Sequence, residues 1–251
     1  MAETAKPVTQ NEISRVAERL QRAYPYIHAR KVREGVLGDP PLDSLIRAIL
    51  SQHTTDVNRD RAFNALKSTY RDWNTVADAP LEELTDVIHF TNHAYTKAQR
   101  IQAILRELRE EYTEPTLDFL RQWPTEQVIE YLRHFTGVGE KTAAIVCLFS
   151  LKRPVMAVDT HVYRVTQRLG WLHEQTNPDK AHGILQRIIP CDLILPLHMG
   201  LWEHGRVTCR PKPKCAQCAV YEFCIYPEKT APMPDVSYAI TVTSGIERKA
   251  A

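Results

Sequence analysis

The 251 residues, 43% of them apolar, are enough for one large or two modest domains with a real hydrophobic core. A net charge of only +2 gives no global sign of a nucleic-acid-binding protein, so any basic surface must be local. No apolar run reaches membrane-spanning length and the N-terminal segment lacks the apolar core of a secretory signal, so we expect a cytoplasmic protein that does not contact a membrane.

The N-terminal half of the chain is predicted to be helical. Residues 9–12 form a capping-box pattern that opens a helix. Residues 24–41 hold three prolines and two glycines and are predicted to be a connector. An apolar helical face follows at residues 42–50 and ends at the polar, turn-prone segment 51–56. The first helix is predicted to bury one face, made of Ile13, Val16, Ala17 and Leu20.

The rest of the chain continues in the same way. Alternation typical of a strand is missing until residues 236–242, near the C-terminus. The fold class is therefore predicted to be all-α, with short links and no internal repeat. Further helices are predicted around residues 62–66 and at 81–89, 96–112, 117–121, 125–135, 140–149, 160–169, 179–189 and 193–204.

A glycine hairpin, Thr136 to Gly139, separates two of these helices. Its two glycines permit backbone angles that other residues resist, and a hairpin that ends at a helix N-terminus presents free N–H groups to a phosphate. Lys141 follows in the first helical turn, where the helix dipole disfavours a cation and a lysine amine can act as a nucleophile. Taken alone, this short pattern fits an exposed lysine beside an ordinary turn better.

A second motif changes that balance. Asp159 opens the segment Asp-Thr-His-Val-Tyr-Arg, where it is predicted to cap the following helix. Together, GVGEKTA at residues 137–143 and AVDTHVYR at residues 157–164 resemble the helix-hairpin-helix DNA glycosylases, specifically the endonuclease III family. The resemblance runs from about residue 42 to residue 224, and its motifs are specific in combination.

The resemblance implies an architecture of two helical domains that flank a DNA-binding cleft. A helical barrel at residues 36–153 would carry the hairpin. Residues 9–35 and 154–226 would form a discontinuous second domain with an iron–sulfur cluster, followed by a C-terminal tail at residues 227–251. In this arrangement Lys141 and Asp159 face each other across the cleft.

Four of the six cysteines form a compact C-x5-C-x2-C-x5-C pattern. Cysteine chemistry alone permits either zinc or a [4Fe–4S] cluster, and the resemblance points to [4Fe–4S]. The family commonly has six residues in the first gap, where this chain has five. Cys147 and Cys191 stand alone in apolar surroundings and are predicted to be core residues. The four predicted ligands are Cys209, Cys215, Cys218 and Cys224.

The first gap of this pattern holds three cations interleaved with two prolines. It is either a solvated charged loop or, because ligands tether both ends, a loop that contacts DNA phosphates; the second is favoured. The cations are Arg210, Lys212 and Lys214.

The chemistry that the resemblance implies begins when the target nucleotide is flipped out of the duplex. Lys141 would attack C1′, displace the base and form a Schiff base, and β-elimination would then nick the strand 3′ to the site. Asp159 would accept a proton or stabilise the positively charged sugar. The hairpin residues Gly137, Val138 and Gly139 would bind the phosphate backbone through their N–H groups.

Comparison with sister families favours this bifunctional branch. Adenine-mismatch glycosylases carry a catalytic glutamate where this chain has Arg47, and thymine-mismatch glycosylases carry a tyrosine where it has Lys141. The chain also departs from its own family. His53, next to Gln52, stands where a duplex-inserting glutamine is usual, and His93 stands where a hydrophobic wedge is usual. Both histidines would contact DNA or, alternatively, lie on surface loops.

Three further residues near these motifs are weaker candidates. His161 and Arg164 would line the cleft beside Asp159 or pack between helices. Arg206 would serve domain packing or phosphate contact.

The sequence thus predicts a monomeric enzyme that acts on duplex DNA containing damaged bases or abasic sites, associated with the nucleoid in a bacterium. Its predicted reaction is removal of oxidised pyrimidines and strand nicking. The alternatives are a glycosylase for another damaged base, or a paralogue that binds DNA structure with weak catalysis.

Overall fold

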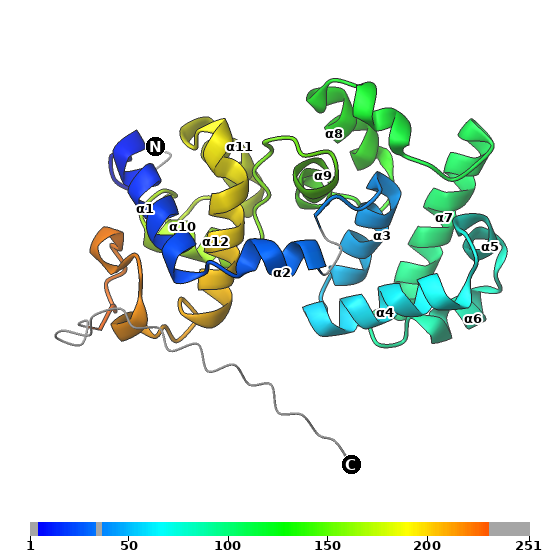
Figure 1. Ribbon diagram of the computed structural model, residues 1–251, viewed down its shortest axis with the longest axis horizontal. Coiled ribbons are helices and arrows are strands. Elements are labelled where there is room, and N and C mark those ends of the chain that lie inside the picture. Colours follow the sequence, from blue (N-terminus) through cyan, green and yellow to red (C-terminus); the bar gives the residue numbers. More distant parts are fainter. Residues whose placement is uncertain (1–4, 34–36, 231–251) are drawn as a thin grey trace, which may run out of the picture.

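The computed structural model describes residues 5–33 and 37–230, and over these ranges the chain is helical without a strand. The predicted all-α class is therefore confirmed. Figure 1 shows two groups of helices side by side, with α2 (Ile27–Arg33) running between them. The expected alternation at residues 236–242 lies outside the described residues, as does most of the predicted tail. Among the described residues, no helix is long and apolar enough to cross a membrane.

The first group of helices packs around the buried face of α1 (Gln10–Ala23). Ile13, Val16 and Leu20 are fully buried there, as predicted, against Trp171. Thr9 caps the helix by accepting a hydrogen bond from the Glu12 N–H, but the Glu12 carboxylate does not complete a capping box. It accepts instead from the Trp171 indole at 2.8 Å. The group consists of α1 (Gln10–Ala23), α10 (Thr160–Arg168), α11 (Pro178–Ile188) and α12 (Ile194–Val207).

The second group encloses a separate hydrophobic core. Its members are α3 (Pro41–Ser51), α4 (Asp56–Thr69), α5 (Trp73–Asp78), α6 (Leu81–Val87), α7 (Ala94–Tyr112), α8 (Thr125–His134) and α9 (Glu140–Ile145). The sequence did not predict α5. The helix predicted at residues 117–121 is a 3-10 helix, Asp118–Gln122, and the connector predicted at residues 24–41 contains α2.

One helix belongs to both cores. After α9 the chain continues as a π-helical turn, Val146–Ser150. Ala143 and Val146 pack into the second core, whereas Ala144 and Leu148 pack into the first. Because both cores draw on this helix, Lys141 at its start is held at the junction of the two groups. The domain boundaries inferred from the sequence stay a prediction.

The two lone cysteines behave differently. Cys147 is fully buried, and burial raises the pKa of its thiol to about 11, as expected for a core residue. The same prediction for Cys191 is wrong. Cys191 opens a 3-10 turn directly after Pro190 and is exposed to solvent.

Candidate active site

The glycine hairpin between α8 and α9 has one glycine that its backbone requires. Gly137 has a φ of +86°, whereas Gly139 has an extended backbone with φ −95° and ψ −177°. A Cβ on Gly137 would also lie 2.7 Å from the Cδ atom of Arg100. The Val138 N–H donates to the Phe135 carbonyl at 3.0 Å, so this turn already uses one of the N–H groups that the sequence assigned to phosphate.

Gln52 ties the neighbouring loop to the hairpin. Its amide nitrogen donates to the Gly137 carbonyl at 3.0 Å, and its amide oxygen accepts from Arg100 at 3.2 Å. Both ends of the side chain are therefore engaged within the protein. This arrangement positions the loop after α3 against the hairpin; the predicted DNA contact of Gln52 stays a prediction.

Lys141 and Asp159 line one cavity of about 530 Å³ although they belong to different helices. Lys141 is exposed in the first turn of α9, and Asp159 is the N-cap of α10. The predicted cap is present: the Asp159 Oδ1 atom accepts from the N–H groups of His161 and Val162, both at 2.8 Å. These two bonds fix the carboxylate at the wall of the cavity, which we call the junction pocket.

The junction pocket has apolar and polar walls. His161 lines the pocket, in agreement with one of the two predictions made for it from the sequence. Arg164 is not among the lining residues. The Arg164 guanidinium instead donates to the carbonyls of Cys209 and Gly205, at 2.9 and 2.8 Å, and so joins α10 to α12 and the cysteine loop. The apolar lining is made by Ala48, Ile145, Phe149, Met199 and Trp202.

His53, which lines the junction pocket, is brought together with His93, which is not among the lining residues. Their rings form an edge-to-face pair with centroids 6.0 Å apart, and both side chains are exposed. Both residues have a left-handed backbone, with φ values of 52° and 58°. Asn92 holds the two loops together, because its side chain donates to the His53 carbonyl at 2.6 Å. The sequence indicated the two residues separately but not this pairing.

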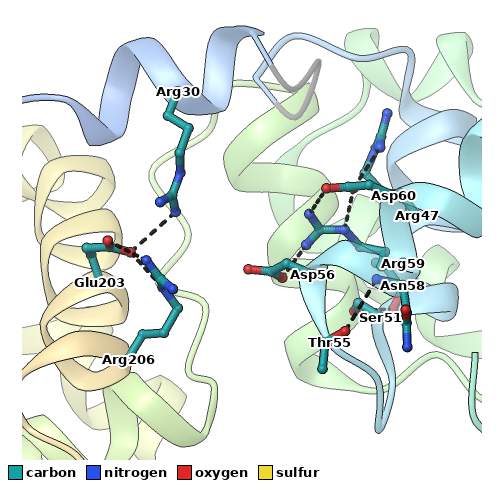
Figure 2. Close-up of polar contacts among 11 residues, drawn as sticks. Arg30, Arg47, Ser51, Thr55, Asp56, Asn58, Arg59, Asp60, Glu203 and Arg206 are labelled. Carbon is teal, nitrogen blue, oxygen red and sulfur yellow. Dashed lines mark hydrogen bonds and ion pairs between the residues drawn. The ribbon is translucent and has the colours of Figure 1, made fainter. Parts of the chain in front are cut away.

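An ion network around two buried arginines, Arg47 and Arg59, lies at the pocket wall contributed by α3, α4 and Asp39 (Figure 2). Arg47 donates to Asp39 at 3.0 Å and to Asp60 at 3.2 Å. Arg59 donates to both oxygens of Asp60 and to Asp56, at 2.7 to 2.9 Å. Burial raises the pKa of the Asp39 carboxyl, and the Arg47 guanidinium opposes that rise. The sequence singled out Arg47 only because a sister family has a catalytic glutamate at this position. The ion network was not predicted.

A second ion cluster lies on the opposite side in Figure 2. Glu203 on α12 is fully buried, and its two oxygens accept from Arg206 at 2.7 and 2.9 Å. Tyr26 and Arg30 also donate to it, at 2.8 and 3.3 Å. Burial alone would raise the pKa of Glu203, but the hydrogen bonds from Arg206 and Tyr26 outweigh burial and lower it. This contact of Arg206 lies within α12, so the two roles predicted for Arg206, domain packing and phosphate contact, stay predictions.

The four cysteines of the predicted metal motif line one small pocket, Cys209 to Cys224, at the other end of the first helix group. The described residues contain no group of metal-binding side chains placed to hold a single metal ion. Burial, with smaller contributions from the three neighbouring thiols, raises the pKa of the Cys218 thiol to about 12, so a positively charged group between them would stabilise the thiolates. Arg168 and His204 contact the sulfur atoms of Cys209 and Cys218 at 3.3 and 3.5 Å. The donor set fits a thiolate-bound cluster.

The cationic loop in this motif is held by its backbone. Arg168 donates to the carbonyls of Arg210 and Pro211, at 2.7 and 3.1 Å. The side chains of Arg210, Lys212 and Lys214 are exposed. They are therefore accessible to a phosphate, and their contact with DNA stays a prediction.

Comparison with known proteins identifies the class to which this fold and site belong. The model of the HhH-GPD superfamily of base excision DNA repair proteins matches residues 46–191. Endonuclease III of Thermotoga maritima is 37% identical over 73% of this chain and 82% of its own length. Endonuclease III of Rickettsia conorii is 33% identical over 72% of this chain and 82% of its own length. A longer relative from Arabidopsis thaliana is 36% identical over 70% of this chain, which covers 60% of that relative.

Solved structures give the same answer. An endonuclease III in a non-covalent complex with DNA superposes with a TM-score of 0.73 and 27% identity, covering 87% of this chain and 96% of that chain. A trapped covalent endonuclease III–DNA intermediate superposes equally well, over 97% of that chain. The protein is a DNA glycosylase of base excision repair, of the glycosylase/AP lyase class. Within the HhH-GPD superfamily it belongs to the endonuclease III family.

Proposed function

We propose that this chain is a bifunctional DNA glycosylase and AP lyase that removes oxidised pyrimidines from duplex DNA and nicks the strand 3′ to the site. The observation that carries the proposal is the convergence of Lys141 and Asp159 on one pocket from two different helices. DNA binding alone would require neither an amine nor a fixed carboxylate at this position. The similarity to an endonuclease III trapped in a covalent complex with DNA supports a covalent route.

The proposed reaction has two stages. The Lys141 Nζ atom attacks C1′ of a flipped nucleotide, the C1′–N bond breaks, and its electron pair leaves with the base. The attacking amine passes a proton to Asp159. The C1′–O4′ bond then breaks as the nitrogen forms a double bond to C1′, O4′ takes up that proton, and a Schiff base to the opened sugar remains. Loss of a proton from C2′ then breaks the C3′–O bond and releases the 3′ phosphate, which nicks the strand.

Asp159 is suited to this role because its carboxylate does not have to be ordered during the reaction. The Oδ1 atom is held by hydrogen bonds from two backbone N–H groups at the start of α10. The Oδ2 atom accepts no hydrogen bond from the described part of the chain, so it is available to the amine or to the positive sugar. A preorganised negative charge at this position stabilises the transition state without reorganisation.

Contacts outside the pocket would position the duplex. The N–H groups of Gly139 and the first turn of α9 are suited to a backbone phosphate. The exposed pair of His53 and His93 is suited to the space that a flipped base leaves, since imidazole rings can stack and form hydrogen bonds. Arg210, Lys212 and Lys214 would contact a phosphate further along the strand. One copy of the chain would suffice for these contacts.

Cys209, Cys215, Cys218 and Cys224 would hold a [4Fe–4S] cluster. Its proposed role is structural: bound to the four thiolates, it would fix the loop that carries the three cations. Purified protein should then be yellow-brown and contain about four iron atoms per chain. Stoichiometric zinc without iron would contradict the cluster, and Cys218→Ser should lower the yield of soluble protein, because ligand loss removes folding energy.

Borohydride trapping tests the reaction. On a duplex with one oxidised pyrimidine, the wild type should form a covalent protein–DNA adduct, because borohydride reduces the Schiff base. Lys141→Gln should abolish both the adduct and the nick without lowering the melting temperature, since Lys141 is exposed and outside both cores.

Three other outcomes would contradict parts of the proposal. An adduct formed by Lys141→Gln at the wild-type rate would identify another amine as the nucleophile. Base release without any adduct would indicate a glycosylase without lyase chemistry. Excision of alkylated purines, with oxidised pyrimidines left intact, would reassign the lesion class.

A further inference from the structure

Arg47 is a buried cation in the wall of the junction pocket, and the reaction proposed above does not use it. It lies on α3, its residue is 8% exposed, and it is one of the residues that line the pocket. A buried charge is costly unless other groups satisfy it, so the position of this guanidinium requires an explanation.

Three contacts fix the orientation of the Arg47 guanidinium. Its Nε atom donates to Asp39 at 3.0 Å, and its Nη1 atom donates to Asp60 at 3.2 Å. Its Cζ atom lies 3.8 Å from the centre of the Phe63 ring, so one face of the guanidinium is covered. A guanidinium held in this way can present its remaining donors in one direction only.

Arg59, in the same network, provides the contrast (Figure 2). Its Nε, Nη1 and Nη2 atoms all donate to the carboxylates of Asp56 and Asp60. Arg59 therefore holds α4 together. The Nη2 atom of Arg47, by comparison, makes no hydrogen bond to any described residue, and Arg47 borders the cavity. A donor in this position is satisfied only by water or by a ligand.

The charges around Arg47 indicate the kind of acceptor that fits. Arg47 and Arg59 contribute two positive charges, and Asp39, Asp56 and Asp60 contribute three negative ones, so the network carries a net charge of −1. This excess of negative charge disfavours a phosphate beside Arg47. A neutral carbonyl oxygen accepts a hydrogen bond from a guanidinium without that repulsion.

We propose that Arg47 recognises the flipped base by donating from Nη2 to a carbonyl oxygen of a pyrimidine. This inference rests on the proposed function, because Lys141 must hold C1′ in the same pocket. The attached base then has to occupy the remaining space, where Phe149 and Met199 supply apolar contacts for its faces. A guanidinium has donors only, so it selects a base edge that carries an acceptor. Arg47 is thereby a specificity-determining residue for base release and not for the attack on an abasic sugar.

The test compares two substrates that differ only in the base. Single-turnover rates are measured on a duplex with 5,6-dihydrothymine and on the same duplex with an abasic site. Arg47→Met should lower the ratio of base release to abasic nicking about ten- to a hundredfold, the usual effect of losing one hydrogen bond from a charged donor. Arg47→Lys, which keeps the charge beside the two carboxylates, should fold like the wild type and restore the ratio in part.

Arg59→Met is the matched control from the same network. It should lower the melting temperature and leave the ratio of the two rates unchanged, because the Nε, Nη1 and Nη2 atoms of Arg59 all donate hydrogen bonds to carboxylates. If Arg47→Met behaves in the same way, with both rates falling together, Arg47 is a structural residue and the inference is wrong. An unchanged dihydrothymine rate in both Arg47 variants would also overturn it.

A binding measurement separates this inference from the proposed function. In a Lys141→Gln background, the affinity for the dihydrothymine duplex is compared with that for a duplex carrying a tetrahydrofuran abasic analogue. Arg47→Met should remove the preference for the base-containing duplex. If the wild type neither releases the base nor nicks, the proposed function fails, and this preference still decides the role of Arg47. Absence of any preference that depends on Arg47 would overturn the inference.

Discussion

Lys141 and Lys97 both lie near the end of α3, the first at the junction pocket and the second in the buried interior. Lys141 is exposed and lines the pocket with the loop that follows α3. Lys97 is 2% exposed, and its Nζ atom donates to the Leu50 carbonyl at 2.8 Å. Burial lowers the pKa of the Lys97 amine to about 8, with a smaller contribution from the Arg100 charge.

On pKa alone, Lys97 would be the candidate nucleophile, since lysines tuned in this way are common in active sites. Its geometry excludes that role, because Lys97 does not line the junction pocket and its amine donates a hydrogen bond to a backbone carbonyl. A nucleophile needs access to the substrate first and a suitable pKa second. The comparison therefore separates groups that face the pocket, which should change rates, from buried charges, which should change stability.

The largest expected effect on stability comes from Glu203. Glu203→Ala leaves Arg206 and Arg30 without their buried carboxylate and should cost about 3–5 kcal/mol of unfolding free energy. Denaturant unfolding measures this cost. Glu203→Gln, which keeps the shape and one acceptor, should lose less. A large fall in the rate of base release by folded Glu203→Gln would break the separation between buried and pocket-facing charges.

Lys97 should make the folding stability of the protein depend on pH. Its pKa of about 8 in the folded chain lies below that of an unfolded lysine, so the unfolded chain binds more protons between these values. Stability of the wild type relative to Lys97→Met should therefore rise by about 3 kcal/mol from pH 8 to pH 10.5. Urea unfolding of both proteins across this range measures the difference. Lys97→Met should still form the borohydride adduct; loss of the adduct in folded protein would undo the comparison of the two lysines.

Local patterns in the sequence were sufficient for the parts of the site that depend on neighbouring residues. The cap by Asp159, the break at Gly137 and the start of α9 follow from residues within one or two turns. The connector prediction failed because α2 lies among prolines and glycines that suggested a loop. The prediction that both hairpin glycines are needed for unusual backbone angles was wrong for Gly139. Glycine permits such angles, but the backbone of Gly139 is extended.

The long-range contacts of the ion networks could not be predicted, because the residues that make them are distant in sequence. Arg30 and Glu203 are separated by 173 residues, and only the packing of α2 against α12 brings them together. The pairing of His53 with His93 has the same origin, because two loops must first be tied together by Asn92. The pocket position of Lys141 and Asp159 was expected from family resemblance, since spacing alone does not place two helices across a cavity.

Asp159 belongs to both sides of the comparison, because it lines the pocket and also caps a helix. Asp159→Asn should slow base release about a hundredfold or more by removing the charge. It should cost at most about 1 kcal/mol of stability, because asparagine also serves as an N-cap. Single-turnover kinetics and melting measurements separate these two effects. A variant that loses stability but keeps its rate would reduce Asp159 to a structural cap.

The smallest expected effect is on DNA affinity, from cations far from the pocket. Each phosphate contact releases counterions, so Lys212→Ala with Lys214→Ala should reduce the slope of log affinity against log salt by about 2. The control is Arg71→Ala with Arg121→Ala, which removes the same charge from the other helix group, where both side chains form exposed ion pairs. The control should leave the slope unchanged, because a change in net charge alone releases no bound counterions. Fluorescence anisotropy over a salt series measures the slopes. If the loop variant has the same salt slope as the wild type, or if the control variant loses as much slope as the loop variant, the loop with Lys212 and Lys214 does not contact the phosphates.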